Sequence, residues 1–276
     1  MILNFITWDV SPEIFSIPLE TNLVGGLSIR WYGLLFAMSF IFGYIIMKKI
    51  FTNEGLGEKV LDQLSTYMLV ATIIGARLGH CLFYEPSYYL SHPLEILKVW
   101  EGGLASHGAA VGIFIGLYIF ARTNKKPVLW IFDRIAIVVA LSGFFIRSGN
   151  LMNSEIFGDI TTMPWGFIFV RYFDTALAID PRHPTQIYEA LSYLAIFIFL
   201  YRFYWKSKGK TNNGEIFGYF MILLFGVRFL IEFIKVPQVG FEETMFLNMG
   251  QILSIPLILT GFIMLWFANK NKIKEI

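Results

Sequence analysis

The sequence predicts an all-α polytopic membrane protein with about seven transmembrane helices. Of its 276 residues, 56% are hydrophobic and only 15% are charged, whereas an ordinary globular domain is roughly 45–50% apolar and about 25% charged. The apolar residues gather into long runs that do not alternate as β-barrel strands do. Because the sequence shows no internal repeat and no soluble second region, we expect a single transmembrane domain over residues 1–276.

Seven segments are long and apolar enough to cross a bilayer, which takes about 20 mostly apolar helical residues. In chain order they are Trp31–Met47, Leu64–Tyr84, Ala105–Ala121, Leu129–Ile146, Gln186–Trp205, Ile216–Ile234 and Gly250–Ala268. The residues before the first span lack a basic stretch followed by a continuous apolar run, so no cleavable signal peptide is expected. The first span is therefore expected to act as the insertion signal.

Lysine and arginine are distributed unequally between the two sides of these spans. The connections after spans one, three and five and the tail after span seven hold most of them: Lys48, Lys49, Lys59, Arg122, Lys125, Lys126, Arg202, Lys206, Lys208, Lys210, Lys270, Lys272 and Lys274. Short loops rich in lysine and arginine stay in the cytoplasm. The N-terminus is therefore predicted outside and the C-terminus in the cytoplasm, which agrees with an odd number of spans.

Two larger connections are then predicted on the outer side. An arm at about residues 85–104 is rich in proline and aromatic residues, which is typical of a membrane interface. A head at about residues 155–184 contains the apolar run MPWGFIFVRYF, and we expect it to form a small cap that includes strands.

Most of the unusual polar residues of the spans are predicted to lie near the outer face. They are Tyr32, Arg77, His80, His107, Arg147, Asn150, His183, Gln186, Arg228 and Glu232. An arginine within a span costs roughly 2.5–3.5 kcal/mol on insertion scales, so it faces the bundle interior and has a partner. One interpretation is purely structural: Arg228 and Glu232 are four residues apart and can pair on one helix face, and Arg147 could pair with Glu155.

The stretch IRSGNLMNSEIFG, residues 146–158, favours a second interpretation, a site for an anion. Asn150 and Asn153 follow Arg147 at spacings of three and six, which on a helix places two amides beside the guanidinium. A guanidinium binds phosphate through two parallel hydrogen bonds and stays charged in a low-dielectric site. This set suits the phosphate and hydroxyl groups of a lipid headgroup.

His107 lies in ASHGAAVG, where small neighbours leave room for a close helix or a substrate. A lone histidine in a span is usually a structural residue, but the predicted level of His107 beside the arginines favours a role as general base. In RHPTQIYE, residues 182–189, Pro184 suits the first turn of a helix, and Thr185 and Gln186 can satisfy free N–H groups there. Tyr32 is equally typical of an aromatic anchor at the interface.

The sequence shows no grouping of ligands for a metal and no glycine-rich fingerprint for a nucleotide. We therefore predict no metal, no other cofactor and no nucleic-acid partner. The single cysteine, Cys81, excludes an intramolecular disulfide and is interpreted as a packing residue.

These motifs, in this order, resemble the phosphatidylglycerol–prolipoprotein diacylglyceryl transferase family. The family signature is similar to IRSGNLMNSEIFG, with Ile146 where the family has glycine. The matching positions are Arg147, Gly149, Asn150, Asn153, Glu155 and Gly158. The resemblance also covers RWYG, GARLGHCLFY, WEGGLASHG, RHPTQIYE and GVRFLIEF, and so it spans nearly the whole chain.

The resemblance implies an enzyme of the bacterial inner membrane with its active site toward the outer face. Its partners would be the bilayer, phosphatidylglycerol and prolipoprotein signal peptides, whose lipobox cysteine thiol receives the diacylglyceryl group while glycerol phosphate leaves. The implied catalytic residues are His107, Arg147 and Arg228. The implied substrate-binding residues are Arg147, Asn150, Asn153, Glu155, Gly158, Tyr32, Glu232, Gln186 and His183.

The chain departs from the family pattern at one further position. Some family members have a tyrosine four residues before the second arginine, but this chain has Leu224, so that residue's role is not transferred.

The alternative function is an anionic-lipid transporter or flippase, which would use the same arginines without chemistry. Such a protein would be expected to show inverted repeats, and it would leave His107 without a task.

Overall fold

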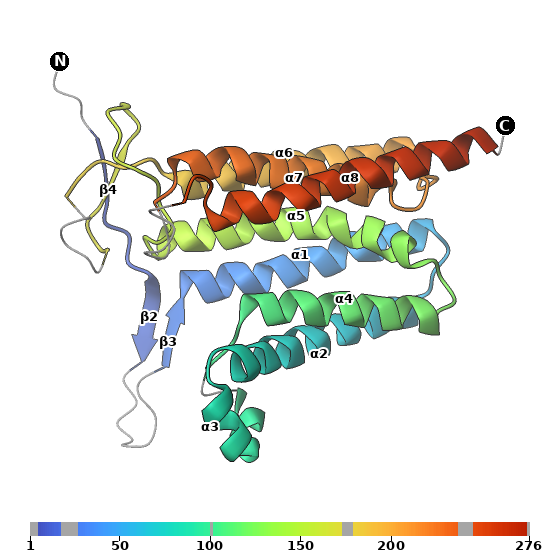
Figure 1. Cartoon of the computed structure of the whole chain (residues 1–276), viewed down its shortest axis with the longest axis horizontal. Helices are drawn as coiled ribbons and strands as arrows, with labels where there is room; N and C mark the ends of the chain where they lie inside the picture. Colours follow the sequence, from blue (N-terminus) through green and yellow to red (C-terminus); the bar gives the residue numbers. More distant parts are fainter. Residues whose placement is uncertain (1–4, 18–26, 100–101, 173–178, 237–244, 275–276) are drawn as a thin grey trace. The chain divides into compact units, whose positions relative to one another are not determined.

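The computed structural model describes residues 5–17, 27–99, 102–172, 179–236 and 245–274. Within these ranges it is mostly helical, and each of the seven predicted spans coincides with a helix (Figure 1). The helices are α1 (Trp31–Asn53), α2 (Glu58–Phe83), α4 (Ser106–Thr123), α5 (Val128–Met152), α6 (Thr185–Lys206), α7 (Glu215–Ile231) and α8 (Met249–Lys274). All but α4 are long and apolar enough to cross a membrane, with α7 extended by the 3₁₀ helix η3 (Glu232–Ile234), so the chain is a polytopic membrane protein.

The chain forms two compact units. One consists of Met1–Ile46 and Ile135–Ile276, and the other of Met47–Arg134.

In the unit Met47–Arg134, helices α2 and α4 pack very closely. Glycines of the two helices face one another, because a Cβ atom on Gly108 would lie only 2.6 Å from the Cα of Gly79. Gly112 meets Gly75 in the same way, with a Cβ on Gly112 2.9 Å from the Gly75 Cα. Small residues of this kind let the backbones of membrane helices approach each other.

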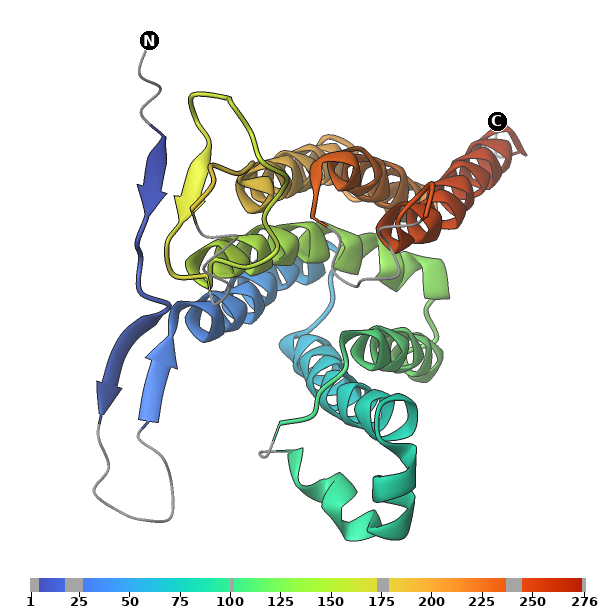
Figure 2. The same cartoon turned by 60° about the vertical axis from the view of Figure 1, so that its left-hand side comes forward.

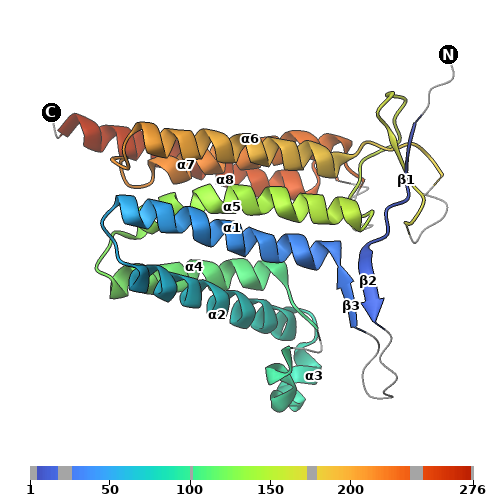
Figure 3. The same cartoon turned by 180° about the vertical axis from the view of Figure 1, so that it is seen from behind.

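The predicted arm in this unit is helical. It contains α3 (Pro86–Ser91) and the 3₁₀ helix η1 (Pro93–Leu97), which follow α2 directly (Figure 3). The side chain of Arg77, only 3% exposed, donates hydrogen bonds to the carbonyl oxygens of Glu95, Ile96 and Gly102 at 2.6–2.9 Å. Arg77 therefore fastens the arm to α2, with backbone carbonyls rather than a carboxylate satisfying its guanidinium.

In the other unit, α1, α5, α6, α7 and α8 run side by side (Figures 1 and 3). Tyr32 of α1 packs against Gly149 of α5, and Tyr193 of α6 packs against Gly143 of α5. Because successive helices of α5–α8 run in opposite directions, the end of α5, the start of α6, the end of α7 and the start of α8 lie at one end of this unit. The start of α1 lies there too.

Two short strand pairs lie beside this end of the helices (Figure 2). Strand β1 (Ile6–Trp8) pairs in parallel with β4 (Phe167–Phe169), which falls within the predicted head, and β2 (Glu13–Ile17) pairs antiparallel with β3 (Leu27–Arg30). The Trp8 indole N–H donates to the carbonyl oxygen of Leu151 at 3.0 Å. That bond ties β1 to the last turn of α5, through a carbonyl that also accepts from the Ser154 N–H.

The fourth predicted span ended at Ile146, but α5 continues to Met152. Arg147 and Asn150 therefore both lie in the helix, as the predicted spacing of three residues along one helix face requires. Asn153 directly follows the last helical residue, and its amide lies beside that of Asn150 as predicted, since both donate to Glu155. The chain turns there because Ser154 adopts a left-handed conformation, with φ at 54°, which commonly terminates helices.

Candidate active site

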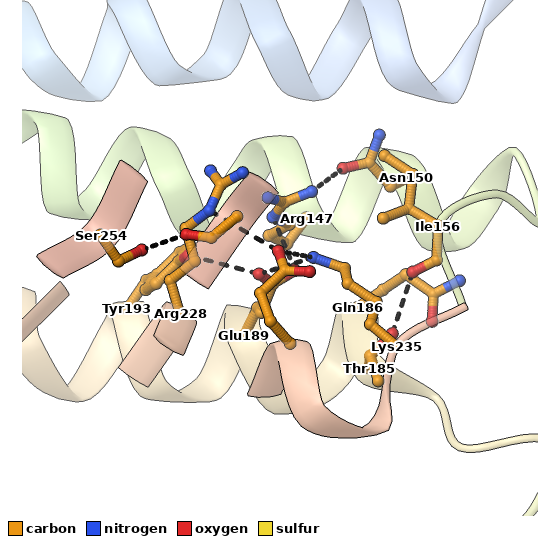
Figure 4. A network of polar contacts seen from close by, with 12 residues as sticks. Arg147, Asn150, Ile156, Thr185, Gln186, Glu189, Tyr193, Arg228, Lys235 and Ser254 are labelled. Atoms are coloured by element: carbon orange, nitrogen blue, oxygen red, sulfur yellow. Dashed lines mark hydrogen bonds and ion pairs between the residues drawn. The ribbon is translucent and has the colours of Figure 1, made fainter. Parts of the chain in front are cut away.

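The unit that contains α1, α5, α6, α7 and α8 holds most of the predicted site residues, and they gather at one end of it. Figure 4 shows the side chains of Arg147, Glu189 and Lys235 meeting from α5, from α6 and from the segment that follows α7. The centre of this cluster is the carboxylate of Glu189, which is fully buried.

Arg147 is held on two sides. Its Nε lies 2.9 Å from Oε2 of Glu189, and its Nη1 donates to Oδ1 of Asn150 at 3.2 Å. The side chain is 13% exposed, so the charge is largely inside the helix bundle and gains a partner there. The prediction that Arg147 pairs with Glu155 is wrong, because Glu189 from α6 occupies that position.

Glu155 is linked to the arginine only indirectly. Its Oε1 accepts hydrogen bonds from the amides of Asn150, at 2.7 Å, and Asn153, at 3.2 Å. The amide of Gln186 donates to the backbone oxygen of Glu155 at 2.7 Å. Asn150 thus bridges Arg147 and Glu155. Gln186 was predicted to satisfy free N–H groups of its own helix, but its amide instead fixes the loop to α6.

Gly158 marks the end of the signature stretch and has no room for a side chain. Its N–H donates to the carbonyl oxygen of His183 at 2.8 Å, and an added Cβ would lie 2.8 Å from both the His183 Cβ and the Thr185 Cγ2. The His183 ring nitrogen Nδ1 lies 3.2 Å from the hydroxyl of Tyr188. The glycine therefore lets the signature loop and the start of α6 touch.

Arg228 forms the predicted pair with Glu232. Its Nε lies 3.6 Å from Oε1 of that residue, and its side chain is 37% exposed. Glu232, in the short 3₁₀ helix η3 (Glu232–Ile234), also accepts from Lys235 Nζ at 3.2 Å and from the Asn248 amide at 3.1 Å. Arg228 is therefore more loosely held and more accessible than Arg147.

Two tyrosines complete the cluster. The Tyr193 hydroxyl lies 3.5 Å from Oε1 of Glu189, and this side chain interacts with both Arg147 and Arg228. Tyr32 lies within electrostatic range of Arg147 and of Glu155.

The family model described as prolipoprotein diacylglyceryl transferase matches residues 18–267. The chain belongs to the prolipoprotein diacylglyceryl transferase family. Relatives named phosphatidylglycerol–prolipoprotein diacylglyceryl transferase include that of Tolumonas auensis, which is 44% identical over 96% of this chain and 98% of its own. The relative from Porphyromonas gingivalis is 46% identical over 98% of this chain and 97% of its own. The relative from Chloroherpeton thalassium is 44% identical over 97% of this chain and 96% of its own.

In this transferase family member, most sequence-predicted residues lie in one unit. Tyr32, Arg147, Asn150, Asn153, Glu155, Gly158, His183, Gln186, Arg228 and Glu232 all belong to it. His107 belongs to the other unit, where it lies in the first turn of α4 with an exposed side chain. Its convergence with the two arginines stays a prediction.

Three members of the cluster were not predicted: Glu189, Tyr193 and Lys235. Glu189 and Tyr193 follow Gln186 at spacings of three and seven, so they share its face of α6, and a carboxylate in an apolar span is a signal in itself. Lys235 follows Glu232 by three residues, a spacing that allows pairing within one turn.

Proposed function

We propose that this protein transfers the diacylglyceryl group of phosphatidylglycerol to the lipobox cysteine thiol of prolipoprotein signal peptides. The thiolate sulfur forms a C–S bond with the glyceryl carbon, and the C–O bond from that carbon to the phosphate breaks. The electron pair leaves with the oxygen of glycerol phosphate, and the product is a thioether. Family membership supports the activity, and the paired arginines of the cluster support the choice of an anionic lipid.

The arginines are proposed to act on the phosphate. Charge develops on the leaving phosphate as the C–O bond breaks, and preorganised cations lower the free energy of that state most effectively where water is excluded. Arg147 supplies a largely enclosed cation that neighbouring side chains fix in place, and Arg228 supplies a second that is more exposed. We assign both to the phosphodiester.

Residues around the arginines are proposed to hold the headgroup and the loop. Asn150, Asn153 and Glu155 form the hydrogen-bonded edge beside Arg147, suited to the glycerol hydroxyls. Tyr32 lies next to this edge, and Glu232 orients Arg228. Gly158, His183 and Gln186 fix the loop against α6, which keeps the edge in place.

His107 is proposed to take the proton of the thiol. A free thiol has a pKa of about 8.5, so only a small fraction is thiolate at neutral pH. A histidine within hydrogen-bond reach, or the field of nearby cations, raises that fraction.

We propose that both units work as one catalytic domain in the bacterial inner membrane, with seven spans. The N-terminus would lie outside and the C-terminus in the cytoplasm, as the distribution of lysine and arginine predicts. The arm, the head and the active site would then lie at the outer face. That is where a signal peptide presents its cysteine after export.

The direct experiment reconstitutes the purified protein in vesicles that contain phosphatidylglycerol and supplies a synthetic lipobox peptide. Mass spectrometry should find the diacylglyceryl thioether, and a matched peptide with serine in place of cysteine should give no product. Movement of phosphatidylglycerol between leaflets without any thioether would instead support the lipid transporter.

A further inference from the structure

Lys235 is a buried lysine that contacts two carboxylates at once. Its Nζ lies 3.1 Å from Oε1 of Glu189 and 3.2 Å from Oε1 of Glu232, and its side chain is 3% exposed. Lysine is almost never fully buried unless it is paired, because an unpaired charge in the interior is very costly. Both short contacts here meet that requirement.

Each of the two carboxylates holds a different arginine of the candidate active site. Glu189 pairs with Arg147 at 2.9 Å, and Glu232 pairs with Arg228 at 3.6 Å. Lys235 is therefore the link between the two arginine–carboxylate pairs. We call the three side chains of Glu189, Lys235 and Glu232 the lysine bridge.

The lysine bridge holds the two carboxylates close to each other. Two carboxylate oxygens that contact one ammonium group at these distances lie no more than about 6 Å apart, and the ammonium charge between them offsets their repulsion. Without Lys235, this repulsion favours a wider separation of the two carboxylates. An arginine whose carboxylate moves loses the contact that places its guanidinium.

The backbone of Lys235 is fixed as well. It forms an antiparallel bridge with Gly158, the last residue of the signature stretch, and the N–H of Asp159 donates to the carbonyl oxygen of Ile234 at 2.9 Å. On the other side, Gly250 of α8 leaves space for Glu232, since a Cβ there would lie 2.6 Å from Oε1. The lysine bridge therefore stands on backbone contacts to the signature loop and on close packing against α8.

Lys235 does not itself reach the substrate, because its ammonium group is enclosed by the two carboxylates. We propose that Lys235 is a positioning residue that holds Glu189 and Glu232 together and so sets the placement of Arg147 and Arg228 for the phosphate. This inference rests on the proposed function. The charged and titratable side chains facing the two carboxylates are Arg147, Tyr193, Arg228 and Lys235, with the neutral amide of Asn248 beside Glu232.

The experiment compares Lys235→Met, Lys235→Arg and the control Lys206→Met in the thioether assay, with kcat and KM measured across pH. Misplacing a catalytic group by about 1 Å costs about 100-fold, so Lys235→Met should lose about 100-fold in kcat/KM at neutral pH. Lys235→Arg should keep the native pH profile, and Lys206→Met, which changes an exposed lysine at the end of α6, should behave as wild type.

A double variant separates this role from a purely structural one. If Lys235 acts through the carboxylates, Lys235→Met combined with Glu232→Gln should be no worse than Lys235→Met alone, because one of the two competing charges is gone. If the two losses multiply, or if Lys235→Met keeps the native rate and pH profile, the inference is overturned.

Two further outcomes are decided in the same experiment. If wild type forms no thioether, the proposed function itself fails, which is a different result from an unaffected Lys235 variant. If Lys235→Met does not yield folded protein by thermal melting, Lys235→Gln takes its place beside Lys235→Arg. A folded neutral variant with the native rate and profile would again overturn the inference.

Discussion

Arg147 is the residue at which charge and shape can be separated by substitution. Its guanidinium contacts Glu189 through Nε and Asn150 through Nη1, at 2.9 and 3.2 Å. Arg147→Ala removes both contacts and the charge. Arg147→Lys keeps the charge but offers one compact ammonium group in place of a planar fork, so it cannot reproduce bidentate contact with a phosphate.

The size of the effect follows from these contacts. Removing one preorganised donor to a developing oxyanion costs about 10²–10³ in kcat, and Arg147→Ala should lose at least that much. Arg147→Lys should lose about 10-fold to 100-fold, because hydrogen bonds between charged groups are roughly twice as strong as neutral ones and only part of them is kept. Breaking a buried ion pair destabilises a fold by about 3–5 kcal/mol, and here the loss should be smaller, since Lys235 remains 3.1 Å from Glu189.

The assay is thioether formation at low and at saturating phosphatidylglycerol, with thermal melting of each variant measured in parallel. Arg171 provides the matched control, because its side chain is 44% exposed and pairs with Asp9 at 2.6 Å. A surface pair of this kind contributes about 0–1 kcal/mol, so Arg171→Ala and Arg171→Lys should stay within about twofold of wild type. Native kcat/KM in Arg147→Ala would refute the assignment of Arg147 to the phosphate, and native kcat/KM in Arg147→Lys would refute the bidentate contact.

Three further substitutions test other parts of the structure. Gly158→Ala places a Cβ 2.8 Å from two neighbouring side-chain carbons and should lower kcat/KM by more than about tenfold, since overpacking costs about 1–3 kcal/mol. The control Gly226→Ala, whose added Cβ would have nothing within 4 Å, should keep the native kcat/KM. Equal rates in the two variants would show that the loop contact of Gly158 is dispensable. His107→Gln should lower the rate of thioether formation, and a near-native rate across pH would exclude His107 as the base. Arg77→Met should make the arm sensitive to limited proteolysis while Arg122→Met does not, and an equally resistant arm would show that the carbonyl contacts of Arg77 do not hold it.

The helices could be predicted because hydropathy and length are local properties. The Arg228–Glu232 pair could be predicted for the same reason, since a spacing of four residues places two side chains on one helix face in almost any bundle. The gathering of Tyr32, Arg147 and Gln186 at one end of a unit followed from the direction in which successive helices cross the membrane.

The partners of the arginines could not be predicted, because they depend on how the helices pack. Arg147 has an acidic residue close by in sequence, Glu155, yet it pairs with Glu189 of another helix. Nothing local indicates that two asparagine amides would engage Glu155 instead. Arg77 is a stronger case, since its partners are backbone carbonyls of the arm, which carry no sequence signal at all.

The two arginines of the cluster differ in a way that bears on how the phosphate is bound. A buried ion pair adds little to stability on its own, since desolvation offsets the attraction, but it holds a charged group in a defined place. Arg147 has this character, with its partner at 2.9 Å and its side chain mostly buried. Arg228 is held at 3.6 Å and is more than one third exposed, so it can exchange its carboxylate for a phosphate at lower cost. If both arginines bind the phosphate as proposed, Arg147 would define its position and Arg228 would stabilise the charge that develops on the leaving oxygen.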